Sequence, residues 1–220
     1  MAKHTCAILC VLLALTICTS AECALPSFRG YTGLLIIPTG DALNKGDFNA
    51  GIFSEDVGDT INDYIANYGL ANGLEVGLNR RTPVDSDDHN TLFNAKYRFI
   101  TETNKNPAVA AGIIDLTDEV ETTAYIVASK AFGTPLGTYR GEILNPRIHV
   151  GFGAGEFSSL FAGISSYIGD RVLASVEWDS ADFHAGLKFR VTDSFTLHGG
   201  VFDIGDDTTV GVGGSFGLSY

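Results

Sequence analysis

The stretch 183–220, FHAGLKFRVTDSFTLHGGVFDIGDDTTVGVGGSFGLSY, decides the fold of this chain. Every second residue from Phe183 to Val191 is apolar, and the residues between them are charged, histidine or glycine. A period of two places the apolar side chains on one face of a β-strand and the polar ones on the other. After short breaks the alternation resumes at Phe195 and again at Val210. We therefore expect three consecutive strands that each separate an apolar environment from a polar one.

The same pattern recurs along the rest of the chain. Glycine is frequent, with 26 residues, as suits strands joined by tight turns. The expected strands are 46–54, 60–68, 73–80, 91–99, 107–115, 122–131, 146–154, 159–167, 171–178, 182–191, 195–203 and 208–220. Their number is even and their length is roughly that of a tilted membrane strand. The sequence predicts an all-β fold, a transmembrane antiparallel up-and-down β-barrel of about 12 strands. The alternative is a secreted soluble β-sandwich that binds glycans or acts as an adhesin.

A targeting segment precedes the barrel. Residues 1–21 combine a basic start, an apolar run and small residues at the end, which is typical of a secretory signal peptide cleaved after Ala21. We expect residues 22–45 to be a periplasmic segment that leads into the barrel domain, 46–220. Cys23 is the one cysteine of four outside the signal peptide, so no internal disulfide is expected. Acylation of Cys18 or Cys23 is the alternative reading.

Composition and motifs argue against several functions. The formal net charge of −12 argues against nucleic-acid binding, which needs a basic patch. The histidines have serine and acidic neighbours, but no Gly-x-Ser-x-Gly nucleophile motif is present. The acidic loop 85–90 lacks the glycine and closing glutamate of a calcium-binding EF-hand loop. We therefore expect no enzymatic activity, no catalytic residues, no cofactor and no metal site.

The polar faces of the expected strands carry charges of both signs, which a barrel would turn toward its lumen. The expected lumen-lining residues are Glu75, Lys96, Arg98, Arg147, His149, Glu177, His184, Lys188, Arg190 and His198. Such charges either line a water-filled conduit or pair across the lumen and plug it. In a conduit, a cluster of Lys96, Arg98, Lys188 and Arg190 would favour anions such as acidic sugars. Both arrangements remain open at this point.

The region before and within the first strands resembles a known family. The matching residues are Gly30-x-x-Gly33-Leu34, Ile37-Pro38-Thr39, Ala42, Gly46-x-Phe48, Tyr68-Gly69-Leu70 and Leu74-Glu75-Val76-Gly77-Leu78. They resemble the opening of the YjbH-type outer-membrane proteins linked to exopolysaccharide production. Family members are several times longer, so this chain would be a short, single-barrel relative. The resemblance implies an outer-membrane barrel and a link to exopolysaccharide export.

The end of the chain carries a second resemblance. Phe216, Leu218 and the terminal Tyr220 resemble the C-terminal signal that the barrel-assembly machinery of bacteria reads. We therefore expect insertion into the bacterial outer membrane after export through the inner membrane. The expected partners are outer-membrane lipid, that machinery, and small polar or anionic solutes or a polysaccharide. Together these features predict a narrow porin or an envelope-structural protein.

Three further expectations concern the edges of the barrel. Aromatic residues precede several of the turns expected on the periplasmic side and would form a girdle there: Tyr68, Phe99, Phe132, Tyr167 and Phe189. Strands 107–115 and 159–167 are apolar on both faces, so they would pack against an inward loop or belong to a sandwich core. The long connection 133–144 would hold a hairpin or a short helix.

Overall fold

The computed structural model describes residues 24–57, 59–84, 89–133, 136–139, 142–205 and 207–219. The expected signal peptide, 1–21, lies outside the described residues, and so does Tyr220. The described residues contain no helix that is long and apolar enough to cross a membrane.

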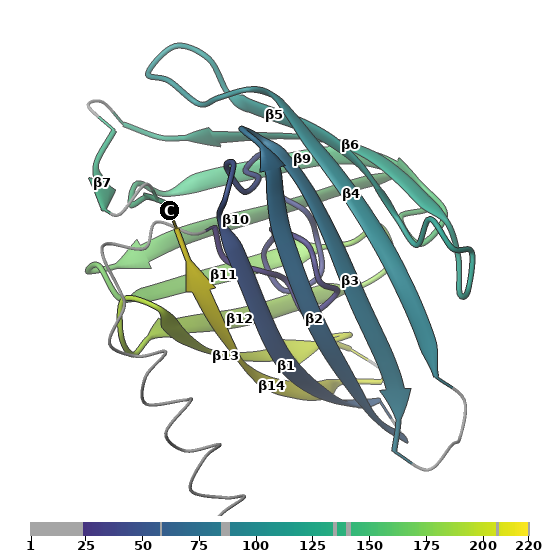
Figure 1. The fold of residues 1–220 in the computed structure, drawn as a ribbon. Coiled ribbons are helices and arrows are strands. Elements are labelled where there is room, and N and C mark those ends of the chain that lie inside the picture. Colours follow the sequence, from purple (N-terminus) through teal and green to yellow (C-terminus); the bar gives the residue numbers. More distant parts are fainter. Residues whose placement is uncertain are drawn as a thin grey trace, which may run out of the picture.

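Twelve of the fourteen strands among the described residues form one closed antiparallel barrel (Figure 1). The barrel strands are β1 (Phe48–Val57), β2 (Asp59–Ala71), β3 (Leu74–Pro83), β4 (Asn90–Ile100), β5 (Ala108–Ile114), β6 (Thr123–Ala131), β9 (Arg147–Ala154), β10 (Leu160–Ile168), β11 (Val172–Trp178), β12 (Phe183–Arg190), β13 (Phe195–Phe202) and β14 (Thr209–Leu218). Consecutive barrel strands pair with each other, β6 pairs with β9, and β1 closes the ring on β14. The prediction of a closed barrel of about 12 strands is confirmed, and the β-sandwich alternative is wrong.

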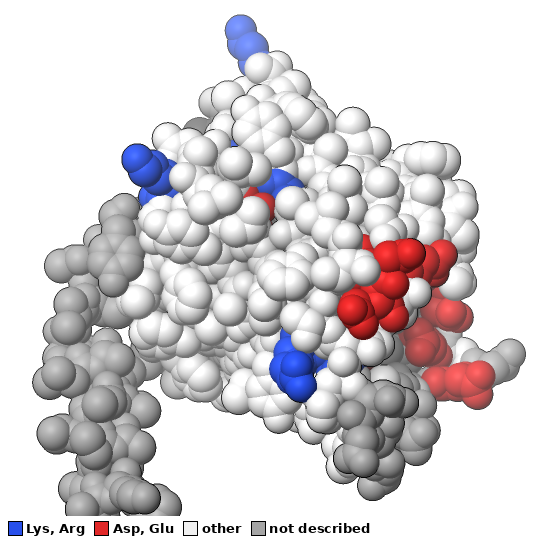
Figure 2. All heavy atoms as spheres, turned by 45° about the vertical axis from the view of Figure 1, so that its right-hand side comes forward, with Lys and Arg blue, Asp and Glu red and all other residues white. Residues whose placement is uncertain are grey.

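The two faces of the strands divide as the alternation predicts. On β12, Phe183, Leu187 and Phe189 point outward with exposed fractions of 56%, 54% and 44%. Their neighbours His184 and Lys188 are buried on the inward face. Figure 2 shows a surface on which charge is sparse over the barrel wall and acidic side chains gather on one side. An apolar exterior of this kind is what a lipid-facing wall requires.

The two ends of the barrel differ, and we name them by the chain. The terminal end is where β1 begins and β14 ends, and it carries the β2–β3, β4–β5, β6–β9, β10–β11 and β12–β13 connections. The loop end carries the other connections, including 155–159 between β9 and β10. Many of the acidic residues lie in these loop-end connections, among them Asp118 and Glu119.

Residues 24–46, which we call the plug, fold back inside the barrel instead of extending from it (Figure 1). Phe28, Leu35 and Ile37 are fully buried, and they belong to one apolar cluster with wall residues such as Phe53. Bridges between positions 26 and 32 and between 33 and 38 give the plug a compact, turn-rich shape. The expectation that this segment lies in the periplasm is therefore corrected for its described residues. They lie inside the barrel, where their apolar side chains are buried away from water.

The two expected strands with apolar residues on both faces, β5 and β10, pack against segments inside the barrel. Ala108 of β5 lies against the plug, since a Cβ added to Gly40 would come within 2.7 Å of the Ala108 carbonyl oxygen. Phe161 of β10 packs on Phe157 of the 155–159 connection, with ring centroids 4.7 Å apart. An inward segment therefore explains both strands, as one of the two sequence readings proposed.

The long connection between β6 and β9 contains a short hairpin, β7 (Thr138–Tyr139) and β8 (Glu142–Ile143). Its Glu142 binds Arg190 of β12 with 2.6 Å between carboxylate oxygen and guanidinium nitrogen. Tyr167 of β10 donates a hydrogen bond to the same carboxylate. Tyr167 therefore faces inward, and its expected place in the outward girdle is wrong, whereas Tyr68, Phe99, Phe132 and Phe189 are exposed.

Candidate functional site

Four charged side chains of the barrel wall hold the plug. Glu75 on β3, Lys96 on β4, Glu177 on β11 and Lys188 on β12 point inward, and each is at most 2% exposed. Around the ring, β11 and β12 lie across the lumen from β3 and β4. An acidic and a basic side chain therefore face the plug from each of two opposite walls.

The first wall binds the middle of the plug through its backbone. Glu75 accepts hydrogen bonds from the Thr32 backbone nitrogen at 2.8 Å, the Thr32 hydroxyl at 2.5 Å and the Leu43 backbone nitrogen at 3.0 Å. Lys96 donates to the Thr32 carbonyl at 2.6 Å. One threonine is thus held at its amide, hydroxyl and carbonyl by two neighbouring strands.

The opposite wall repeats this arrangement. Glu177 accepts from the backbone nitrogens of Ile36 at 2.5 Å and Leu35 at 3.1 Å. Lys188 donates to the carbonyls of Pro26 at 2.7 Å and Gly33 at 2.8 Å. A turn-rich segment lacks a ladder of its own, so its buried backbone groups need such partners.

The remaining expected lumen residues also face the interior. His149 is hydrogen-bonded on both ring nitrogens, to Ser129 at 2.7 Å and Ser165 at 2.9 Å. His198 bonds Ser215 at 2.7 Å, and His184 lies 3.0 Å from Asp179 of the β11–β12 turn. These histidines are buried and hold wall strands or turns together.

The four cationic side chains expected to cluster in the lumen are each bound to different residues of the protein. Arg98 donates to the carbonyl of Ala42 and to the side chain of Asn44, both in the plug. Arg190 binds Glu142 as described above. Lys96 and Lys188 serve plug carbonyls. Among the described residues, the plug takes many of the hydrogen bonds of these charged side chains, so it fills much of the lumen in this conformation.

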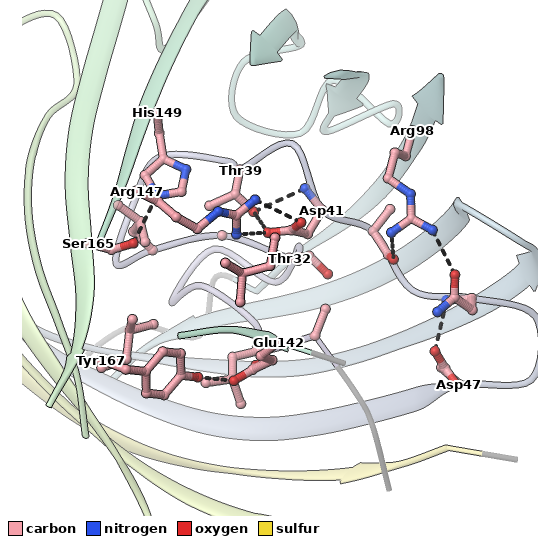
Figure 3. A pocket seen from close by; sticks show the side chains of 18 residues that line it. Thr32, Thr39, Asp41, Asp47, Arg98, Glu142, Arg147, His149, Ser165 and Tyr167 are labelled. Carbon is pink, nitrogen blue, oxygen red and sulfur yellow. Dashed lines mark hydrogen bonds and ion pairs between the residues drawn. The ribbon is translucent and has the colours of Figure 1, made fainter. Parts of the chain in front are cut away.

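A cavity of about 120 Å³ remains at the terminal end, where the plug leaves the barrel (Figure 3). Arg147 binds Asp41 there through two nitrogen–oxygen contacts of 2.5 and 3.1 Å, and it also binds Glu102 at 2.9 Å. Burial tends to raise the pKa of Asp41, but the guanidinium of Arg147 lowers that pKa well below its usual range. Burial raises the pKa of Glu142 on the hairpin to about 7, against the opposing charge of Arg190. Charged side chains therefore line this cavity, and residues of the plug form one of its walls.

The plug also packs closely against glycines of the wall. A Cβ at Gly186 of β12 would lie 2.5 Å from the Cδ2 atom of Leu35, whereas a Cβ at Gly199 of β13 would have its nearest neighbour at 4.0 Å. Glycine at 186 thus makes room for a specific plug side chain. This glycine, which the alternation of β12 places on the polar face, is here in contact with an apolar side chain of the plug.

This contact gives a testable prediction. We expect Gly186→Ala to destabilise the protein by about 1–3 kcal/mol, because the added methyl group overpacks Leu35. The midpoint of the heat-induced gel mobility shift measures the loss. Gly199→Ala is the matched control and should leave that midpoint unchanged. A Leu35→Ala/Gly186→Ala variant should be less destabilised than the sum of the single changes; strict additivity would contradict the contact.

Arg29 of the plug has no distinct signal in the sequence, yet it binds Glu55 of β1. By contrast, the alternation of the strands places Asn79 of β3 and Asp63 of β2 on the inward face, where Asn79 donates to Asp63 at 2.7 Å. The apolar residues of the plug recur with a period of neither 2 nor 3.6, so the sequence predicted only a segment that leads into the barrel. Among the described residues, no group of three or more His, Cys, Asp or Glu side chains is arranged to hold a metal ion.

Comparisons with known proteins bear on the fold. No family model matches the chain, and no curated protein matches it either. The chain is similar to the solved structure of the KdgM porin, with a TM-score of 0.59 and 12% identity over 78% of this chain and 99% of that one. For the KdgM porin in complex with disordered oligogalacturonate, the TM-score is 0.54 and the identity 12% over 79% and 99%. The NanC porin matches at a TM-score of 0.48 and 12% identity over 77% and 98%. The two KdgM structures show that the chain has the fold of an outer-membrane porin barrel.

Proposed function

We propose that the protein is a bacterial outer-membrane barrel whose lumen is closed by its own N-terminal plug. The outward band of exposed apolar side chains and the porin-like fold support a place in the outer membrane. Recovery of the folded protein as a soluble monomer without detergent would contradict this place.

One observation carries the closure: four buried wall charges on opposite sides of the lumen are bonded to the backbone of residues 24–46. Main-chain groups are the same in any segment, so this binding depends on the shape of the plug more than on its side chains. The plug occupies the route that a solute would take. We infer that the barrel is a narrow channel that conducts when the plug is displaced; bilayer recordings on a plug-deleted variant, described in the Discussion, test this.

The solute class follows from the residues that the plug covers. Displacement would remove the plug partners of Lys96 and Lys188, and of Arg98 and Arg147 toward the terminal end. It would likewise bare the carboxylates of Glu75 and Glu177, and of Glu55 and Asp63 toward the loop end. The similar KdgM porin was solved in complex with oligogalacturonate. We propose small polar solutes, anionic sugars included, as the permeating class. Selectivity for chloride over potassium in the open variant would support it, and selectivity for cations would count against it.

A second candidate, an envelope-structural barrel that never opens, is favoured by the packing of the plug. Phe28, Tyr31 and Leu34 to Ile37 are at most 3% exposed, as in the core of a soluble protein. In this case the plug would serve as a permanent interior. Absence of current from a folded, plug-deleted barrel would support this role over a channel.

Two finer proposals rest on the sequence resemblances. The link to exopolysaccharide export remains a prediction, and unchanged polymer secretion in a deletion strain would contradict it. Recognition by the barrel-assembly machinery also remains a prediction. Phe216 and Leu218 lie on the lipid-facing side of β14, and Tyr220 lies outside the described residues.

A further inference from the structure

The tip of the plug inserts one positive charge among three carboxylates. The guanidinium of Arg29 lies 2.7 Å from Glu55 of β1, 3.8 Å from Asp63 of β2 and 3.7 Å from Glu156 of the β9–β10 connection. We call these three carboxylates the acidic cup. They come from three different parts of the chain, so the barrel itself builds the cup and the plug supplies only its occupant.

Two of the three carboxylates of the cup are deeply buried, and both can accept further hydrogen bonds. Glu55 and Asp63 are 1% and 0% exposed, and one carboxylate oxygen of each has no hydrogen-bond donor among the described residues. The Nε atom of Arg29 is also without an acceptor there. Arg81 lies opposite Asp63 in the register of β2 and β3 and adds a second positive charge nearby. Carboxylate oxygens without donors in a buried place are costly, and a planar, multi-donor cation is the group that fills them.

The cup lies toward the loop end of the barrel. Glu156 lies in a loop-end connection, and its side chain is 38% exposed, whereas that of Arg29 is 14% exposed. The plug enters from the other end, where Pro26 and Asp41 lie. A solute arriving at the loop end therefore meets the tip of the plug before any other part of it.

We propose that the acidic cup is a binding site for a small organic cation that carries a guanidinium or primary amine group, and that Arg29 occupies this site in the closed protein. A free cation that binds the cup competes with Arg29 and loosens the plug from the loop end. This regulation rests on the proposed closure by the plug. The binding site itself does not require conduction, so it is tested separately.

The test is chemical rescue in the full chain. Arg29→Ala empties the site while the rest of the plug stays, and it should lower the midpoint of the heat-induced mobility shift because the cup loses its cation. Added ethylguanidinium should restore that midpoint. If the dissociation constant is about 1 mM, about 10 mM ethylguanidinium shifts the folding equilibrium of the variant roughly tenfold. Choline at equal concentration has no N–H donor and should not restore it.

Three comparisons make the result decisive. The wild type should gain little from ethylguanidinium, because Arg29 fills the site. Arg29→Ala/Glu55→Gln should lose the rescue, and Arg98→Ala, which removes a guanidinium whose acceptors are a carbonyl and an amide oxygen, should show none. Equal stabilisation of all variants, or of none, overturns the proposal.

If Arg29→Ala does not fold without added cation, binding of ethylguanidinium to the cup can be tested by refolding. Its refolding yield from urea into detergent should then rise with ethylguanidinium and not with choline. A yield that stays at zero in both conditions overturns the site. These outcomes are independent of any bilayer current, so failure of the cup and failure of the channel are distinguishable.

Discussion

Deletion of residues 24–40 should turn a silent barrel into a conducting one. In planar bilayers we expect the intact protein to give current close to background, and the variant to give steps larger by on the order of tenfold or more, because a twelve-stranded barrel without its filling has an open lumen. The pairing of β1 with β14 and β2 starts at Phe48, so the deletion leaves the closed ring of strands in place. The buried charges that it bares, such as Glu177 and Lys188, gain water as their new partner.

The control for this experiment is proof of folding. Heat-modifiable gel migration should show the deleted variant as a folded barrel before its current is recorded. Gly199→Ala, which touches nothing within the lumen, should remain as silent as the wild type. A folded variant that conducts no better than the intact protein would remove the channel and leave the structural role.

Removal of the Glu177 side chain should weaken the binding of the plug and lower the stability of the protein. Glu177→Ala leaves the buried backbone nitrogens of Leu35 and Ile36 without an acceptor and should cost about 2–5 kcal/mol of stability, since each unsatisfied buried donor costs about 1–3 kcal/mol. Glu177→Gln retains one carbonyl oxygen and should cost about half as much. Urea unfolding followed by the gel mobility shift measures both.

A matched acidic substitution away from the plug separates this effect from loss of charge alone. Glu121→Gln removes a carboxylate from an exposed loop and should change stability by less than about 0.5 kcal/mol. Brief current openings should accompany Glu177→Ala in bilayers, because the plug is held less tightly. Equal stability of Glu177→Ala and the wild type would show that the backbone bonds of this wall do not hold the plug.

The barrel was predictable from sequence because the alternation that sets the two faces of a strand lies within the strand itself. Alternation at Phe183, Leu187 and Phe189 sets the two faces of β12 without reference to any other strand. Each expected barrel strand overlaps an observed one, and the ends differ by a few residues at most. The inward direction of Tyr167 also follows from its parity with Ser165, whereas its position at a strand end suggested the girdle.

The plug was not predictable in the same way because its partners are distant. Leu35 and the carboxylate that binds its amide are 142 residues apart. The run from Leu34 to Ile37 is apolar without alternation and lies between glycine and proline, so neither a helix nor a strand pattern applies. The structure places charged side chains such as Glu177 and Lys188 on the inward face, but their binding partner is a segment whose place depends on the finished fold.

Both ends of the plug lie at the terminal end of the barrel. Pro26 is bound by Lys188 near the turn after β12, and the chain leaves again past Asp41 toward the start of β1. Withdrawal as a loop would therefore break no hydrogen bond between barrel strands. The free energy of opening and the free energy of unfolding are then separate quantities. Substitutions at a few wall positions that bind the plug would change how often the plug is displaced. The stability of the barrel itself would stay the same, whether such substitutions arise in evolution or by design.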